Sequence, residues 1–347
     1  MLVFLILAGG SGTRFWPISK RDRPKQLLTI FADKPLLVKT IDRIKDMVDM
    51  DRIFIATTNE LSSSIKEVLP NISDSRIIVE PISKDTCMAI AYSSLIISKY
   101  YKNPTICVMP SDHAIEEENK LKEVIKEAYE NSSDKIITIG LKPTKPSTDY
   151  GYIKSYSNVG TITKVLEFKE KPSYDIAKIY LSEGNYLWNS GIFVFKYDFL
   201  MEELKIHQNN IFKIIDRLSK INNISDLYDL ASVLFSDIER ISIDYAILEK
   251  TNKAYVIEGA FKWNDVGSYL YLEEVLPKDI NDNVIKNTKY IGIDSFNNII
   301  ISNEDTNIAV NLLGISNSII SLTKENILIV NKKDINKLKE LMKKVNI

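Results

Sequence analysis

The hydrophobic positions up to Gly140 follow two alternating spacings. Short, mostly apolar runs, typical of buried strands, occur at residues 2–7, 52–56, 76–79, 105–109 and 135–139, and the first of them is unbroken. Between them, apolar residues recur at helical spacing at residues 35–48, 60–69, 84–101 and 117–131. Strands that alternate with helices in this way predict an α/β fold, with a mostly parallel sheet and helices on both faces.

The pattern changes after Gly140. Residues 150–153 and 161–168 are predicted to pair as antiparallel strands around a turn at residues 158–160. Residues 188–191 predict a turn before a strand at 192–195, and residues 197–250 predict several helices. From about residue 281, short runs rich in Ile, Asn and Val predict a small β-rich domain that ends in a helix at 334–345. The helical pattern stops near Pro277, so the predicted domains are residues 1–276 and 277–347.

A glycine-rich loop follows the first predicted strand directly. Gly9, Gly10 and Gly12 let the backbone turn tightly and approach a ligand, and successive N–H groups in such a loop can bind an anion. Basic side chains follow at Arg14 and Lys25. The loop fits neither the Walker pattern nor the dinucleotide-binding fingerprint. It predicts a polyphosphate site, and the simpler alternative is a tight turn with a solvated basic flank.

Polar residues also stand where two other predicted strands end. Glu80 follows one strand, and Ser111 and Asp112 follow another. Ligands of open α/β sheets bind outside the carboxyl ends of the strands. Asp112 is therefore a candidate for Mg²⁺, which needs only one or two carboxylates when substrate phosphates complete its shell. Asp265, in a short turn before Gly267, is a second candidate, and the alternative for both acids is a helix cap or turn residue.

Composition and charge narrow the classes of function. The 347 residues carry a formal net charge of -1, so no global field attracts nucleic acid or a membrane surface. The opening apolar run is too short to span a bilayer and lacks preceding basic residues, so the default expectation is a cytoplasmic protein. The chain has 2 histidines, and no serine stands in a nucleophile-elbow pattern. A phosphoryl or nucleotidyl transfer fits better, because its catalysis is mostly positioning and charge neutralisation.

Taken together, nine short motifs resemble those of the mannose-1-phosphate guanylyltransferases, within the family of sugar-phosphate nucleotidyltransferases. They occur in the family's order, at residues 7–14 with 16–17, 24–26, 85–86, 110–113, 150–153, 168–172, 188–191, 242–246 and 265–268. The resemblance implies the Rossmann-like nucleotidyltransferase fold. The tail is similar to that of short members that lack a fused isomerase domain. One departure is Cys87–Met88, where the family commonly has Ala–Pro, close to the expected base pocket.

The resemblance also implies a role for each matching residue. Charge neutralisation and catalysis fall to Arg14, Lys25, Asp112 and Asp265, and the two aspartates would bind magnesium. Nucleotide binding falls to Leu7, Ala8, Gly9, Gly10, Ser11, Gly12, Thr13, Glu80, Asp85, Thr86 and Ser111. Sugar-phosphate binding falls to Tyr150, Gly151, Glu170, Lys171 and Asn189, with Lys171 on the phosphate.

The implied reaction converts GTP and mannose 1-phosphate into GDP-mannose and pyrophosphate, with Mg²⁺ as cofactor. Neither nucleic acid nor a membrane is an expected partner, and a homodimer is compatible with the resemblance. The attacking phosphate monoester has a second pKa of about 6, so it is largely ionised at neutral pH and needs no general base. The alternatives are another sugar 1-phosphate such as manno-heptose 1-phosphate, another nucleoside triphosphate, or a catalytically silent regulator that binds nucleotide sugars.

Overall fold

The computed structural model describes residues 1–10, 12–156, 159–302 and 307–345, and these residues form two compact units. Unit 1 comprises Met1–Gly9, Ile41–Ser111 and Ile115–Trp263. Unit 2 comprises Gly10–Thr40, Asp112–Ala114 and Asn264–Ile347. The chain thus passes from one unit to the other inside the glycine loop and again between Ser111 and Asp112. The domain boundary predicted near Pro277 stays a prediction.

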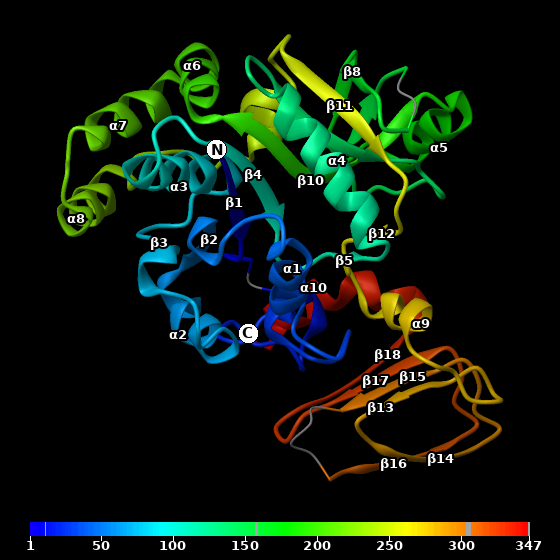
Figure 1. The fold of residues 1–347 in the computed structure, drawn as a ribbon. Coiled ribbons are helices and arrows are strands. Elements are labelled where there is room, and N and C mark those ends of the chain that lie inside the picture. Colours follow the sequence, from blue (N-terminus) through cyan, green and yellow to red (C-terminus); the bar gives the residue numbers. More distant parts are fainter. Residues whose placement is uncertain (11, 157–158, 303–306, 346–347) are drawn as a thin grey trace. The chain divides into compact units, whose positions relative to one another are not determined.

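Unit 1 is built on one large sheet, in which the strands follow the order β3-β2-β1-β4-β10-β6-β11-β8 (Figure 1). Their bounds are β3 (Ile77–Glu80), β2 (Ile53–Thr58), β1 (Leu2–Leu7), β4 (Thr105–Pro110), β10 (Tyr186–Lys196), β6 (Ile136–Leu141), β11 (Ala254–Gly259) and β8 (Ile162–Lys164). The first four strands are mutually parallel, and β11 is parallel to β6. The predicted mostly parallel α/β sheet is therefore confirmed, with β10 as an antiparallel strand between β4 and β6.

Helices cover this sheet, as their apolar spacing predicts. Their bounds in unit 1 are α2 (Asn59–Val68), α3 (Thr86–Tyr100), α4 (Glu118–Asn131), α5 (Tyr174–Glu183), α6 (Tyr197–His207), α7 (Asn209–Ser219) and α8 (Ile224–Leu234), while α1 (Leu36–Ile44) begins in unit 2 and ends in unit 1. α3 packs on β1, β2 and β3 and also contacts α6 and α7, whereas α4 lies against β4, β10 and β11 (Figure 1). α3 is buried from Cys87 to Ile97, which explains its almost wholly apolar sequence.

Two local predictions were wrong. The turn predicted at residues 188–191 lies inside β10, because Trp188 and Ser190 are buried in the sheet and the strand continues through them. Its register shifts between Asn189 and Phe193, and Gly191 accommodates the shift with a φ of 71°. The single strand predicted at residues 161–168 is two strands, β8 beside β11 and β9 (Glu167–Lys169) beside β7 (Tyr152–Lys154), so the predicted antiparallel pairing with residues 150–153 holds for β9 only. The turn between the two predicted strands was placed at residues 158–160, and Asn158 lies outside the described residues.

The C-terminal part of unit 2 is rich in β structure, as predicted. Parallel strands β13 (Val284–Lys286), β15 (Ile299–Ser302) and β17 (Ser318–Leu322) form one sheet with antiparallel β18 (Ile327–Asn331), and β14 (Lys289–Ile293) pairs with β16 (Ala309–Leu313) in another. β13 was not predicted. The predicted terminal helix is a 3-10 segment, Lys332–Lys337, followed by α10 (Leu338–Lys344).

A separate apolar core joins residues 10–40 to this C-terminal part. Phe15, Trp16 and Leu28 pack with Tyr269 and Ile299. The buried Tyr269 hydroxyl donates a hydrogen bond to the carbonyl oxygen of Phe15 at 2.8 Å. The segment that follows the glycine loop is therefore anchored within unit 2. Among the described residues, no helix combines the length and apolarity needed to cross a membrane. The cytoplasmic location and the homodimer stay predictions.

Candidate active site

The glycine loop continues into unit 2 and folds back on residues 24–26. Gly12 has a φ of +59°, and a Cβ at this position would lie 2.6 Å from both the Lys25 nitrogen and Pro24 Cβ, so only glycine fits. The Gly12 carbonyl accepts from Ser19 Oγ at 2.7 Å, and the Gly10 carbonyl accepts from Gln26 Nε2 at 3.1 Å. These bonds fix the loop from Gly10 onward against its own basic segment.

The other loop residues predicted to bind nucleotide surround this turn in the chain. Thr13 begins a 3-10 turn, Thr13–Phe15, and the Arg14 within it is exposed. Ser11 lies outside the described residues. In unit 1, the Leu7 carbonyl accepts from the Ser111 N–H at 3.1 Å, and the Ala8 N–H donates to the Ala56 carbonyl at 2.8 Å. β1 is thus tied to its neighbours up to the start of the loop.

The ammonium group of Lys25 contacts both predicted metal-binding residues, Asp112 and Asp265. The buried Lys25 Nζ donates to the main-chain carbonyl of Asp265 at 2.7 Å and lies 3.0 Å from Asp112 Oδ2. Burial alone would raise the pKa of Asp112, but the charges of Lys25 and His113 hold it below its ordinary value. Asp112 is therefore ionised at neutral pH.

Neither aspartate caps a helix, so the helix-cap alternative was wrong, and the turn-residue alternative stays open. α4 begins only at Glu118, well after Asp112. The short 3-10 helix after Asp265 is capped by Ser268, whose side chain accepts from the Leu270 N–H.

Glu80 ends β3 as a buried carboxyl group in unit 1. Its Oε1 lies 3.5 Å from the position that a Cβ on Gly9 would occupy, so the side chain lies against the start of the glycine loop. Its Oε2 is buried and has no hydrogen-bond partner among the described residues. Burial and the charge of Asp85 raise the pKa of Glu80 to about 7. An unpaired buried acceptor of this kind is costly to keep without a ligand.

Asp85 and Thr86, also predicted to bind nucleotide, start α3. Asp85 Oδ1 accepts from the Thr86 N–H at 2.7 Å, so Asp85 caps the start of this helix. The Thr86 hydroxyl instead accepts from the Ile243 N–H at 2.9 Å. The neighbouring Cys87 and Met88 are fully buried.

The five predicted sugar-binding residues lie together in unit 1. A Cβ on Gly151 would come within 2.3 Å of Glu170 Oε2, so the carboxylate occupies space that only glycine leaves free. The Gly151 carbonyl accepts from the Asn189 N–H at 2.8 Å, and Lys171 Nζ lies 2.7 Å from Glu170 Oε1. The Tyr150 ring packs edge-on against Trp188, with 4.9 Å between the ring centroids. We call Tyr150, Gly151, Glu170, Lys171 and Asn189 the sugar cluster.

Burial alone would lower the pKa of Lys171, but its bond to Glu170 and the charge of Asp244 raise it. Asp244 is the residue that the sequence interpretation missed, since the motif at 242–246 was noticed but none of its side chains was given a role. The Asn189 Nδ2 group donates to Asp244 Oδ1 at 3.0 Å, which joins this acid to the sugar cluster.

Comparison with known proteins identifies the family. The sequence profile named nucleotidyl transferase matches residues 3–282. The chain belongs to the nucleotidyl transferase family. A mannose-1-phosphate guanylyltransferase of Salmonella montevideo is 34% identical over 361 residues, covering 100% of this chain and 74% of the relative. One from Escherichia coli is 32% identical over 358 residues, covering 100% and 76%. The family match makes the chain a nucleotidyltransferase enzyme.

A solved structure agrees with this assignment. A protein from Thermus thermophilus, described as a mannose-1-phosphate geranyltransferase, superposes with a TM-score of 0.88 and 29% identity. The match covers 100% of this chain and 99% of that one. The nucleotidyltransferase fold is therefore confirmed over the whole chain, β-rich C-terminal part included.

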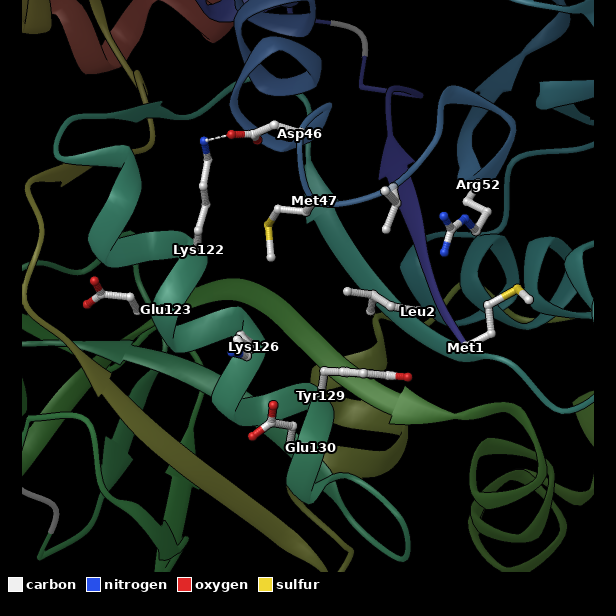
Figure 2. A pocket seen from close by; sticks show the side chains of 11 residues that line it. Met1, Leu2, Asp46, Met47, Arg52, Lys122, Glu123, Lys126, Tyr129 and Glu130 are labelled. Atoms are coloured by element: carbon white, nitrogen blue, oxygen red, sulfur yellow. Dashed lines mark hydrogen bonds and ion pairs between the residues drawn. The ribbon is translucent and has the colours of Figure 1, made fainter.

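A cavity of about 530 Å³ in unit 1 of this nucleotidyltransferase is lined by none of the predicted site residues. It opens beside Met1 and Leu2, where β1 begins, and α4 lines it with Lys126 and Tyr129 (Figure 2). An ion pair of 2.7 Å between Lys122 and Asp46 borders it. The glycine loop and Glu80 follow the opposite, carboxyl ends of the parallel strands. This cavity is therefore not the candidate active site.

Proposed function

We propose that the protein is a sugar-phosphate nucleotidyltransferase that makes GDP-mannose and pyrophosphate from GTP and mannose 1-phosphate. The names of its full-length relatives support this substrate pair. The observation that carries the proposal is the sugar cluster, in which a half-buried carboxylate and amide lie beside the exposed ammonium of Lys171. Such a set can bind ring hydroxyls and a phosphate at once.

In this proposal Lys171 binds the phosphate of the sugar, and Glu170 accepts hydrogen bonds from its hydroxyls. A phosphate oxygen of the sugar attacks the α-phosphorus of GTP, forming a new P–O bond while the bond to pyrophosphate breaks. The attacking oxygen is already ionised at neutral pH, since the second pKa of a phosphate monoester is about 6. The residues therefore need only to orient two anions and offset their repulsion.

We propose that Glu80 recognises the guanine base. Guanine presents two donors on one edge, N1–H and the 2-amino group, and a carboxylate can accept both. Adenine places an unprotonated N1 at the same edge, which would face the carboxylate as acceptor against acceptor. The buried Oε2 without a partner supports this role, because guanine would supply the missing donor.

The glycine loop, Arg14 and Lys25 are proposed to receive the triphosphate, and Asp112 and Asp265 are proposed to hold a magnesium ion. Asp112 is held ionised beside Lys25, and carboxylate oxygen is the ligand that Mg²⁺ prefers. Within the described residues there is no group of three or more His, Cys, Asp or Glu side chains placed to hold a metal. This suits an ion whose other ligands are substrate phosphates. When bound, Mg²⁺ would neutralise charge on the triphosphate.

The test is pyrophosphate release from a panel of four nucleoside triphosphates against several sugar 1-phosphates, with magnesium. The proposal predicts the highest kcat/KM for GTP with mannose 1-phosphate. A higher value with manno-heptose 1-phosphate, or with another nucleotide, would reassign the substrate and leave the reaction in place. No release with any pair would support the silent regulator instead.

A further inference from the structure

Asp244 is an acid of unit 1 that contacts the sugar cluster and has no role in the proposed reaction. It begins a short π-helix, Asp244–Leu248, and its side chain is half-buried. Asn189, a member of the sugar cluster, donates from Nδ2 to Asp244 Oδ1 at 3.0 Å. The two residues are 55 positions apart, so this bond is a tertiary contact.

The hydrogen bonds of Asn189 fix which way its amide points. Its Oδ1 accepts from Thr138 Oγ1 at 3.0 Å and from the Gly191 N–H at 3.2 Å, which uses both lone pairs of the oxygen. One hydrogen of Nδ2 is donated to Asp244. A flipped amide would set its NH₂ group against the Gly191 N–H and its oxygen against Asp244, so the flip is disfavoured. The second Nδ2 hydrogen has no acceptor among the described residues and remains for a ligand.

We propose that Asp244 is a positioning residue of the sugar cluster. Its hydrogen bond fixes the orientation of the Asn189 side-chain amide, so that this amide presents a hydrogen-bond donor, and no acceptor, to the sugar. The inference rests on the proposed function, because it presumes that the sugar cluster binds the sugar. Glu170 is the acceptor of the same cluster. The site would then recognise two ring oxygens, one accepting from Asn189 and one donating to Glu170.

The protonation state of Asp244 shows which of its properties matters. Burial and the charge of Glu170 raise the pKa of Asp244 to about 7. Lys171 lowers the pKa of Asp244, the Ser242 hydroxyl lowers it through a hydrogen bond, and the charge of Asp244 in turn raises the pKa of the buried Cys87 thiol of α3. Near neutral pH the carboxyl is present in both forms, and either can accept from Asn189. Hydrogen-bond acceptance is therefore the required property, and a neutral asparagine can replace it.

The experiment measures the Kd of GDP and the Kd of GDP-mannose by calorimetry. The ratio of the first to the second gives the contribution of the sugar to binding. Asp244→Ala should weaken GDP-mannose binding about ten-fold and leave GDP binding unchanged, because one fixed donor is lost. Asp244→Asn should stay within about three-fold of the wild type, since its Oδ1 still accepts. The double variant Asn189→Asp with Asp244→Asn exchanges the two side chains and conserves the charge. This swap should bind GDP-mannose as weakly as Asp244→Ala does, because it keeps the hydrogen bond between the two residues but removes the donor to the sugar.

Glu249→Gln is the matched control. Glu249 Oε1 accepts from the backbone N–H of Glu170 at 3.3 Å, so the control alters an exposed acid that touches the same segment. It should leave the ratio unchanged. An Asp244→Ala protein that melts normally and keeps the wild-type ratio overturns the inference, as does a swap variant with a wild-type ratio. If Asp244→Ala does not fold, the comparison of Asp244→Asn with the swap decides in the same way. A wild type that releases no pyrophosphate from GTP and mannose 1-phosphate overturns the proposed function itself, which is a different outcome.

Discussion

Replacing Glu80 with glutamine should stabilise the ligand-free protein at pH 8 while it impairs the use of GTP. The Glu80 side chain is buried, its Oε2 has no hydrogen-bond partner among the described residues, and Asp85 adds an unfavourable charge nearby. A neutral amide of nearly the same shape removes the cost of holding an ionised group there. A residue that destabilises the fold in this way is retained for function and not for structure.

The raised pKa of Glu80 determines the sign and the size of the change in the free energy of unfolding. The pKa of Glu80 lies at about 7 in the folded protein, above its ordinary value of 4.5. The folded state therefore holds the proton more strongly, so the contribution to stability is complete below pH 4.5 and is lost as the pH rises through 7. The loss at pH 8 amounts to roughly 3 kcal/mol, since each pKa unit corresponds to about 1.4 kcal/mol.

The assay is urea unfolding of wild type and Glu80→Gln at pH 4.5 and at pH 8. We expect similar free energies of unfolding at the acidic pH and an advantage of roughly 2–3 kcal/mol for the variant at pH 8. Glu203→Gln is the matched control, because Glu203 is also buried but lies near a cation, 3.6 Å from Lys253 Nζ. That change should give no such advantage. Equal stability of Glu80→Gln and wild type at pH 8 would refute the reasoning.

Three further predictions concern the substrates. Lys171→Ala should raise the KM for mannose 1-phosphate far more than the KM for GTP, because the Lys171 ammonium is proposed to bind the sugar phosphate alone. Steady-state kinetics with each substrate varied would show this difference, and an equal rise in both KM values would count against the role. Asp112→Asn and Asp265→Asn should each lower kcat by orders of magnitude at every magnesium concentration while the protein stays folded; folded variants with near-normal turnover and unchanged magnesium dependence would exclude a shared metal site. ATP should be turned over much more slowly than GTP, and comparable rates in the same assay would remove the guanine assignment but not the reaction type.

The parts of the fold that could be predicted are those with local patterns. β1 was found because Leu2–Leu7 is an unbroken apolar run, and α3 because its apolar residues continue over four turns. The turn residues Asn189, Ser190 and Gly191 were misleading, since Asn189 pairs with Gly140 of β6 and Ser190 is buried, which keeps the segment in a strand despite its composition. Local propensity yields to tertiary packing at such positions.

Long-range contacts explain what the sequence could not show. Residues 10–40 group with the C-terminal part through contacts such as that of Tyr269 with Phe15, which no local spacing reveals. Lys25 likewise meets Asp112 and Asp265 only in three dimensions, although each residue could be nominated from its motif. Asp244 could not be nominated, because its importance comes from the orientation that it imposes on Asn189.

The most direct test of the proposed function is the identity of the product. Purified protein would be incubated with GTP, mannose 1-phosphate and magnesium, and the mixture followed by ³¹P NMR. We predict that the signals of GTP and mannose 1-phosphate decline together while GDP-mannose and pyrophosphate grow in equal amounts. Consumption of GTP without incorporation of mannose, or no consumption of either substrate, would contradict the proposed function.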